Sequence, residues 1–398
     1  MVLPHTVSVL PTVSNKLNRK KIIRITTVPL SLDIFCRGLL KELSEEYDVL
    51  AVSSPGPLLD KVAEREGVRT VAVPMERRPS PVKDLKALAR LTRLFREERP
   101  DMVHSMTPKA GLLSMAAARL AGVPVRVHTF TGLVFPSSKG LKRLVLKTTD
   151  RITASCATHV LAEGQGIKKD IESYGITRKR VTILGHGNVR GVDMSWYARN
   201  AATDAAAQSI RRRYSIGKNA FTFAFIGRLV RDKGLCELVN AFSRLSSESD
   251  VHLFLVGEME PQQDPLPEDV LAKIDSNPNI HSSDGWQEDI RPWLAASDAF
   301  VLPSYREGFP NTVLEAGAMG LPCIVTDING SREIITDGVN GIIVAPKSEA
   351  ELYKAMKSFA KHPMAVARMS LKSREMVAGR FEQGYVRNCL KEFYHSIL

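Results

Sequence analysis

SYREGFPNTVLEAGAMGLP, residues Ser304–Pro322, joins a loop that ends in a Pro-Asn pair to a run with the composition of a packed helix. Two carboxylates lie eight positions apart in it, Glu307 before the expected helix and Glu315 in its first turns. The first amides of a helix lack intrahelical acceptors and carry the positive end of its dipole. The segment is therefore expected to bind an anion such as a phosphate group. The loop from Phe309 to Val313 is the expected anion site, and the expected ligand-binding residues of the segment are Gly308, Phe309, Pro310, Asn311, Thr312 and Val313.

The two carboxylates cannot both face a phosphate, because like charges at close range repel. They are better suited to accept hydrogen bonds from neutral hydroxyl groups on either side of it. A nucleotide sugar has this pattern, with a ribose and a sugar flanking a diphosphate. A structural alternative is a capping box, in which Glu315 bonds back to the backbone of Thr312.

The length and composition are those of a globular protein of two or three domains. Its 398 residues are 44% apolar, but no uncharged stretch is long enough to span a bilayer, and the N-terminus lacks the order of a signal peptide. We therefore expect neither secretion nor a membrane anchor. The five cysteines are far apart and include no CxxC pair, which favours a reducing cytoplasm. They are Cys36, Cys156, Cys236, Cys323 and Cys389.

The net charge of +12 favours an acidic partner. Nucleic acid is not expected, because no basic segment is interleaved with aromatic residues. Basic residues recur at helical spacing after Lys139 with apolar residues among them, which suits an anionic membrane surface. A solvated helix face is the alternative. The residues concerned are Lys139, Lys142, Arg143, Lys147 and Arg151, with Leu141, Leu144, Val145 and Leu146.

Short β-rich runs alternate with helical patterns, which predicts an α/β protein with two doubly wound parallel sheets facing a cleft. The expected domains are an extension over 1–20, a first domain over 21–192, a second over 193–382 and a final helix over 383–398 that packs on the first. The glycine-rich segment Gly185–Asn200 is the expected hinge. In the first domain, strands are expected over Ile22–Thr27, Val49–Ser53, Thr70–Val73, Met102–His104, Val125–Thr129, His159–Leu161 and Val181–Leu184, with helices over Ile34–Glu46, Leu85–Glu98 and Gly111–Leu120. In the second, strands are expected over Phe221–Ile226, Val251–Val256, Ala299–Leu302, Cys323–Thr326 and Gly341–Val344, with helices over Leu235–Leu245, Val270–Ile274 and Thr312–Met319.

The segment IGRLVRDKG follows the first strand of the second domain. Gly227 allows close approach of the backbone, and Arg228 and Lys233 can both reach a diphosphate. Together they can neutralise a leaving diphosphate without a metal, and the chain has no Asp-x-Asp pair to hold one. Two solvated loop cations are the alternative.

GRLVRDKG and EGFPNTVLEAGAMGLP, followed by DGVNGIIV, resemble the retaining glycosyltransferases of family four, which have the GT-B fold of two Rossmann-like domains. The resemblance covers nearly the whole chain from Lys21. First-domain segments such as PDMVHSMTPKAGLLSMAAARLAGVPVRVHTFTG are similar to members that build bacterial capsular or surface polysaccharides.

The resemblance implies that Arg228 and Lys233 bind the donor diphosphate, that Glu307 contacts the donor sugar and that Glu315 contacts the ribose. It places Trp286 to Ile290 near the nucleobase, although Trp286 could equally be a core residue. The family's usual histidine is replaced by Thr131, and His128 is the substitute expected in a catalytic or sugar-binding role. A structural role for His128 is the alternative. The family's Gly-Gly in the first strand-to-helix loop is also missing here, where the chain reads TVPLSL over 27–32.

These observations predict a cytoplasmic transferase, associated with the inner face of the cell membrane, that needs neither a metal nor another cofactor. The resemblance implies that it moves a sugar from a UDP-linked donor, with retention of configuration, to a glycan or a polyprenyl-diphosphate-linked acceptor. A UDP-sugar epimerase of similar build and a non-catalytic nucleotide-sugar-binding protein are the rivals. A glycoside hydrolase is disfavoured, because both glutamates lie on one short segment.

Overall fold

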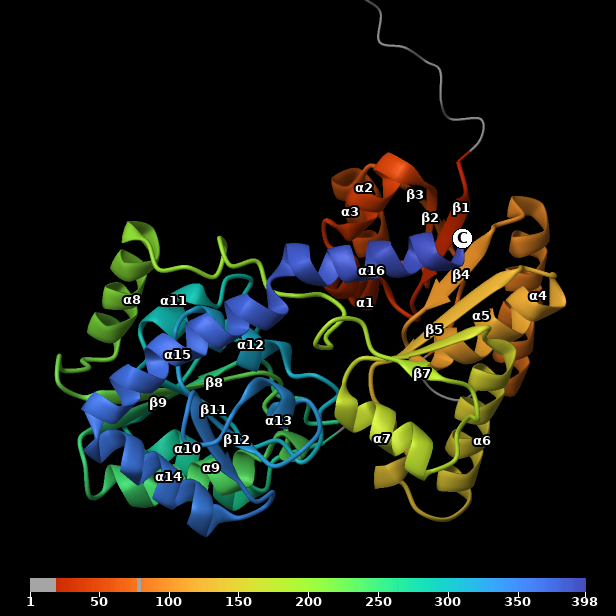
Figure 1. Ribbon diagram of the computed structural model, residues 1–398. Coiled ribbons are helices and arrows are strands. Elements are labelled where there is room, and N and C mark those ends of the chain that lie inside the picture. Colours follow the sequence, from red (N-terminus) through yellow and green to blue (C-terminus); the bar gives the residue numbers. More distant parts are fainter. Residues whose placement is uncertain (1–18, 77–79, 263) are drawn as a thin grey trace, which may run out of the picture. The chain divides into compact units, whose positions relative to one another are not determined.

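The protein is built on two parallel sheets with helices around them (Figure 1). The computed structural model describes residues 19–76, 80–262 and 264–398, so most of the extension expected over 1–20 lies outside the described residues. The described residues form two compact units, one of 19–129, 147–160 and 394–398 apart from 77–79, and one of 130–146 and 161–393 apart from 263.

The first sheet has seven strands in the order β3-β2-β1-β4-β5-β6-β7. The order reverses beside β1, which pairs in parallel with both β2 and β4. Its strands are β1 (Lys21–Ile25), β2 (Asp48–Ser53), β3 (Arg69–Ala72), β4 (Met102–Ser105), β5 (Val125–Phe130), β6 (His159–Ala162) and β7 (Val181–Thr182). The helices that follow them are α1 (Pro29–Cys36), α2 (Leu39–Glu46), α3 (Pro57–Glu66), α4 (Pro81–Glu98), α5 (Pro108–Leu120), η1 (Phe135–Ser137), α6 (Gly140–Cys156) and α7 (Gln165–Ser173).

The second sheet has six strands in the order β10-β9-β8-β11-β12-β13. Every residue of β9 is buried, as expected of a parallel strand covered on both faces. Its strands are β8 (Phe221–Ile226), β9 (Val251–Val256), β10 (Ile280–Ser282), β11 (Ala299–Leu302), β12 (Cys323–Thr326) and β13 (Gly341–Val344). Its helices are α8 (Ala201–Arg213), η2 (Arg231–Lys233), α9 (Leu235–Ser246), α10 (Glu268–Ser276), α11 (Arg291–Ala295), α12 (Asn311–Ala318), α13 (Ser331–Ile334), α14 (Glu349–Lys361), α15 (Pro363–Phe381) and α16 (Gln383–Ile397).

The predicted α/β fold class is confirmed, and five strands of the second sheet have the bounds that the sequence predicts. The single helix expected over Ile34–Glu46 is wrong, because the chain breaks into α1 and α2. Gly38 takes a left-handed conformation there, with φ 73°, which an uninterrupted helix cannot contain. The short strand β10 was not predicted, because three residues carry little periodic signal.

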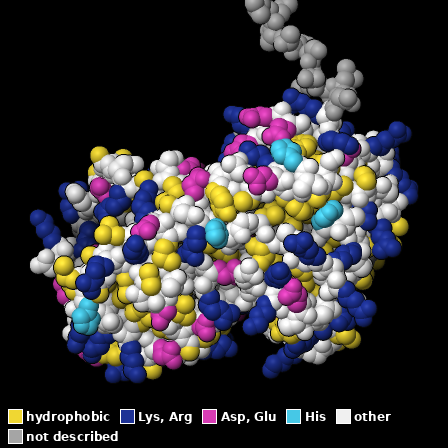
Figure 2. All heavy atoms as spheres, in the orientation of Figure 1, with side chains coloured by type: hydrophobic (Ala, Val, Ile, Leu, Met, Phe, Trp, Pro, Cys, Tyr) yellow, Lys and Arg dark blue, Asp and Glu magenta, His cyan; other side chains and the backbone are white. Residues whose placement is uncertain are grey.

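Lys and Arg side chains are scattered over the face of the molecule in Figure 2 rather than gathered in one patch. None of the described helices has an apolar window long enough to cross a bilayer.

The end of α16 contributes a buried aromatic residue to the first unit. Tyr394 is fully buried, and its hydroxyl accepts a hydrogen bond from Arg24 Nη1 at 2.6 Å and lies 2.6 Å from His104 Nδ1. Arg24 is itself 2% exposed, so its charge depends on such partners. The last residues of the chain thereby close a polar cluster over β1 and β4.

Replacement Tyr394→Phe should lower the free energy of unfolding by about 1–3 kcal/mol, because the buried guanidinium loses an acceptor while the ring volume is kept. Urea denaturation followed by circular dichroism measures the change. Tyr385→Phe, on the same helix but 41% exposed, is the matched control and should alter stability by less than about 0.5 kcal/mol. Equal effects of the two changes would contradict the structural role of Tyr394.

Candidate functional site

Glu307 lies in the loop after β11 and forms an ion pair with Lys233. Ser304, two residues beyond the end of β11, donates a hydrogen bond to Glu307 Oε1 at 2.7 Å. The carboxylate is largely buried, with 14% of its side chain exposed. The structure therefore brings together two residues that the sequence places 74 positions apart, and Lys233 is not a solvated loop cation.

The topology of the second sheet explains this meeting. Lys233 ends η2 after β8, and Glu307 follows β11, the strand on the other side of β8 where the order reverses. Crevices at such reversals are the usual ligand sites of open α/β sheets. Gly234 permits the close contact, because it has φ 74° and a Cβ atom there would lie 2.1 Å from the Pro303 carbonyl oxygen.

Arg228 follows β8 but has a different partner from Lys233. Its Nη1 forms an ion pair with Glu260 Oε2 at 2.7 Å, and 53% of its side chain is exposed. The backbone at Gly227 is packed closely, since a Cβ atom at Gly257 would lie 2.0 Å from the Gly227 carbonyl oxygen. Arg228 is thus at the same sheet edge as Lys233 but remains accessible to a ligand.

The segment from Phe309 to Val313 divides into backbone that can bind a ligand and backbone that cannot. Pro310 has no N–H, and Val313 already donates to the Pro310 carbonyl oxygen at 3.1 Å. Over the described residues, the amides of Phe309, Asn311 and Thr312 have no acceptor. The expected anion site is thus narrowed to these three amides.

Close packing fixes the position of this loop. A Cβ atom at Gly308 would lie 1.9 Å from the Thr131 carbonyl oxygen, so no larger residue fits without displacing the backbone. The Phe309 side chain is buried against Phe381, with ring centroids 5.4 Å apart. Phe309 can therefore offer a ligand its amide but not its ring.

Glu315 lies inside α12, with 7% of its side chain exposed. The helix begins at Asn311 and Pro310 is its N-cap without a side-chain hydrogen bond, so the capping box at Thr312 is not formed. Glu315 Oε1 instead forms an ion pair with Arg190. The Tyr197 hydroxyl also hydrogen-bonds to Glu315, and burial together with this carboxylate raises the pKa of Tyr197.

The residues expected near the nucleobase differ in exposure. Trp286 is 67% exposed, so the alternative that it is a core residue is wrong. Ile290 packs against the core of the second sheet and is the N-cap of α11. An exposed indole beside the loops after β9 and β10 is available for stacking.

His128 is a buried residue at the end of β5. It is 2% exposed, its Nδ1 lies 2.8 Å from Ser105 Oγ, and a Cβ atom at Gly111 would lie 2.3 Å from its ring. Burial lowers the pKa of His128 to about 3, so the imidazole is neutral at physiological pH. Thr131, the other position considered for this role, contacts the Gly308 loop through its backbone carbonyl.

Four residues that the sequence argument missed contact the predicted carboxylates or their helix. Ser304 could have been predicted as a site residue, because it lies just beyond the carboxyl end of β11, where ligands of such sheets bind. Asn188, Arg190 and Tyr197 lie within the segment Gly185–Asn200 that we expected to be a hinge, and their partners are far away in sequence.

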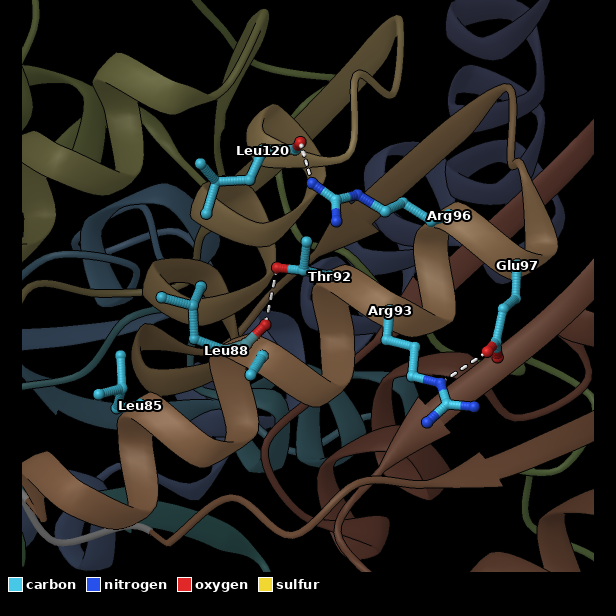
Figure 3. Close-up of a pocket in the computed structure, with 8 residues that line it drawn as sticks. Leu85, Leu88, Thr92, Arg93, Arg96, Glu97 and Leu120 are labelled. Carbon is cyan, nitrogen blue, oxygen red and sulfur yellow. Dashed lines mark hydrogen bonds and ion pairs between the residues drawn. The ribbon is translucent and has the colours of Figure 1, made fainter.

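A groove of about 650 Å³ on the first unit lies along α4 and contains none of the predicted site residues (Figure 3). Leu85 and Leu88 line it beside the end of α5, and Arg96 donates to the Leu120 carbonyl oxygen at 3.4 Å. The groove is therefore a separate feature from the Glu307 loop.

Two family profiles match the chain. The family described as glycosyl transferases group 1 matches residues 220–362, and the glycosyl transferase 4-like domain matches residues 34–187. The chain belongs to this family of glycosyltransferases.

Relatives agree with the family match. The capsular polysaccharide biosynthesis glycosyltransferase CapM of Staphylococcus aureus is 27% identical over 390 residues, covering 96% of this chain and 98% of the relative. The UDP-Gal:alpha-D-GlcNAc-diphosphoundecaprenol alpha-1,3-galactosyltransferase of Escherichia coli is 32% identical over 311 residues, covering 76% and 77%.

The GT-B fold is shared with solved structures. Anabaena HepE in complex with UDP superposes with a TM-score of 0.79 at 18% identity, over 95% of this chain and 100% of HepE. WaaG, a glycosyltransferase involved in lipopolysaccharide biosynthesis, superposes with a TM-score of 0.68 at 15% identity, over 92% and 98%. The predicted fold and family resemblance are confirmed.

The buried imidazole of His128 should make stability depend on pH. Its pKa is about 3 in the folded chain and about 6.5 when unfolded, so below pH 6.5 unfolding takes up a proton and stability falls toward pH 3. Between pH 5.5 and 4, His128→Asn should reduce the slope of unfolding free energy against pH by about 1.4 kcal/mol per pH unit. Chemical denaturation across this range measures the slope. The exposed His186→Asn is the control, and an unchanged slope in His128→Asn would contradict the prediction.

Proposed function

We propose that this glycosyltransferase moves a hexosyl or N-acetylhexosaminyl group from a UDP-sugar to a glycan or polyprenyl-diphosphate-linked acceptor in bacterial surface polysaccharide synthesis. The observation that carries the proposal is the pairing of Glu307 with Lys233 at the order reversal of the second sheet. Glu307 can accept hydrogen bonds from the hydroxyl groups of the donor sugar, and Lys233 beside it can bind the diphosphate. The two residues are therefore placed to hold the two sides of the bond between sugar and phosphate.

In the proposed reaction, Lys233, Arg228 and the three open amides at the start of α12 stabilise the charge that develops on the leaving diphosphate. Glu307 accepts hydrogen bonds from the donor sugar, and Glu315 from the ribose. Trp286 and Ile290 flank the nucleobase, and His128, neutral and buried, contributes to the sugar side of the site. No metal or other cofactor takes part, and the sugar keeps its anomeric configuration.

The choice of donor and acceptor rests on relatives. The E. coli relative is named for UDP-Gal and a diphosphoundecaprenol-linked sugar. A Campylobacter jejuni relative, 22% identical over 324 residues, is named for another diphospho-undecaprenol acceptor. HepE was solved with UDP and with UDP-glucose. These names support a UDP-sugar donor and a lipid-linked acceptor for this chain.

The proposed domain boundaries are those expected from the sequence, with 21–192 serving the acceptor, 193–382 serving the donor and 383–398 packing on the first domain. The contacts of Tyr394 with Arg24 and His104 support the last of these. The protein is proposed to work in the cytoplasm at the inner face of the cell membrane.

Glu307→Gln should lower kcat/KM for the UDP-sugar by about 10- to 100-fold, because a neutral amide replaces a charged acceptor worth about 1.5–3 kcal/mol. Turnover is measured with UDP-Glc, UDP-Gal, UDP-GlcNAc and UDP-GalNAc and a polyprenyl-diphosphate-linked sugar. The exposed Glu349→Gln on α14 is the control and should keep wild-type turnover.

Equal turnover by Glu307→Gln and wild type would remove Glu307 from the site. An epimerised UDP-sugar formed without acceptor would favour the epimerase. Binding of UDP without turnover of any donor would favour a non-catalytic nucleotide-sugar-binding protein. The anomeric configuration of the product, read by NMR, tests retention.

The N-terminal part of α6 is the proposed membrane contact. Leu141 and Leu144 are 76% and 62% exposed, next to the exposed cations Lys139, Lys142 and Arg143. Exposed leucines flanked by cations suit partial insertion among anionic headgroups.

Replacement of both leucines, Leu141→Ser with Leu144→Ser, should lower binding to anionic vesicles by about tenfold, since each leucine contributes about 1.5–3 kcal/mol when fully buried and less at an interface. Flotation with vesicles containing phosphatidylglycerol measures binding. The matched control is Val82→Ser with Leu85→Ser on α4, where the side chains are 69% and 67% exposed. Equal losses from the two helices would contradict a specific contact by α6.

A further inference from the structure

A polar turn over residues 188–191 is fastened to the start of α12. Asn188 is 3% exposed and takes a left-handed conformation with φ 62°. Its Oδ1 accepts hydrogen bonds from the backbone N–H groups of Arg190 at 3.0 Å and Gly191 at 2.7 Å. Its Nδ2 donates to Asn311 Oδ1 at 3.1 Å. The turn and the first residue of the helix are therefore held together.

The other side of the turn is held by the junction of α15 and α16. The Val192 N–H donates to the Phe381 carbonyl oxygen at 2.8 Å, and the Gln383 N–H donates to the Val192 carbonyl oxygen at 3.0 Å. Gly191 has φ 67°, and a Cβ atom there would lie 2.6 Å from Gln383 Cα. The backbone that carries Arg190 is thus fixed from two directions.

Arg190 extends from this turn to Glu315. Its Nη2 pairs with Glu315 Oε1, and only 18% of its side chain is exposed. Burial opposes the charge of Arg190, but Glu315 beside it raises the pKa of Arg190 above the usual value, so the guanidinium stays charged. Within the described residues the buried Nε has no acceptor. The guanidinium therefore pairs with Glu315 although this position leaves its own Nε–H without a hydrogen bond.

We propose that Arg190 is a positioning residue, which pairs with Oε1 of Glu315 and, together with the Tyr197 hydroxyl, holds the carboxylate in the orientation that accepts from the ribose hydroxyls of the donor. The inference rests on the proposed ribose role of Glu315. Arg190 acts through Glu315 and sets how strictly the enzyme requires a ribonucleotide.

The consequence of this arrangement is discrimination between ribose and 2′-deoxyribose. A buried acceptor that is fixed in place rejects a ligand lacking the hydroxyl, because the acceptor is left unpaired. A carboxylate that is free to reorient can turn toward other donors and loses this selectivity. Arg190 is therefore expected to affect the ratio of kcat/KM for the two donors more than kcat.

The experiment compares a UDP-sugar with the matching 2′-deoxy-UDP-sugar in wild type, Arg190→Met and Arg190→Lys. Wild type should prefer the ribonucleotide by about tenfold or more. Arg190→Met should lose most of this preference through a raised KM for the UDP-sugar. Arg190→Lys should recover part of it, since Lys keeps the charge but not the planar fork.

Arg374→Met is the matched control, because Arg374 is a structural arginine that donates to the carbonyl oxygens of Tyr197 at 2.8 Å and Met194 at 3.1 Å. It should lower turnover of both donors equally. Arg190→Met with the wild-type ratio would overturn the proposal, whatever its overall activity. If Arg190→Met does not fold, Arg190→Gln, which also removes the charge, takes its place, and the wild-type ratio in that variant would overturn the proposal.

Glu315→Gln separates the inference from the function on which it rests. The preference for the UDP-sugar over the 2′-deoxy-UDP-sugar is measured in both variants. If Glu315→Gln loses this preference and Arg190→Met keeps it, only the role of Arg190 is overturned. Retention of the ratio in Glu315→Gln overturns the ribose assignment, and the inference with it.

Discussion

Backbone contacts that only glycine allows hold the strand ends of the second sheet together. Gly257 rests against the Gly227 carbonyl oxygen and Gly234 against that of Pro303. A side chain at either position would meet a carbonyl oxygen closer than 3 Å, so the loops after β8, β9 and β11 would have to separate. Lys233 is adjacent to the second of these contacts, and its pairing with Glu307 depends on it. Close packing of the backbone at these glycines therefore fixes the positions of Lys233 and Glu307.

The sequence predicted the parts of the fold that depend on local pattern. Strands such as Phe221–Ile226 and Val251–Val256 are runs of mostly apolar residues, and their bounds are correct. The break at Gly38 was missed because a single glycine inside a helical pattern is often tolerated. The loops bearing Lys233 and Glu307 could be assigned to strand ends, and topology then brings strand ends to one edge.

The partners of the carboxylates could not be predicted in the same way. Arg190 and Glu315 are 125 positions apart, and nothing periodic links a glycine-rich turn to one helix rather than another. The assignment of 185–200 as a hinge rested on its glycines, yet Gly191 is required by close approach to Gln383. A single sequence does not distinguish a glycine that is required by tight packing from one that provides flexibility. The capping box at Thr312 was a plausible local alternative that a distant arginine displaced.

The ion pair between Lys233 and Glu307 has a consequence for how ligands compete for the site. The two side chains are already paired with each other in the absence of a ligand, so a ligand that binds here must replace the ion pair. A free hexose has hydroxyl groups but no charge to offer the ammonium group, and it would leave a partly buried lysine without a counterion. A diphosphate supplies that counterion and releases the carboxylate at the same moment. If Lys233 and Glu307 bind the donor as proposed, recognition of its sugar therefore depends on its diphosphate, and a free sugar competes poorly for the site.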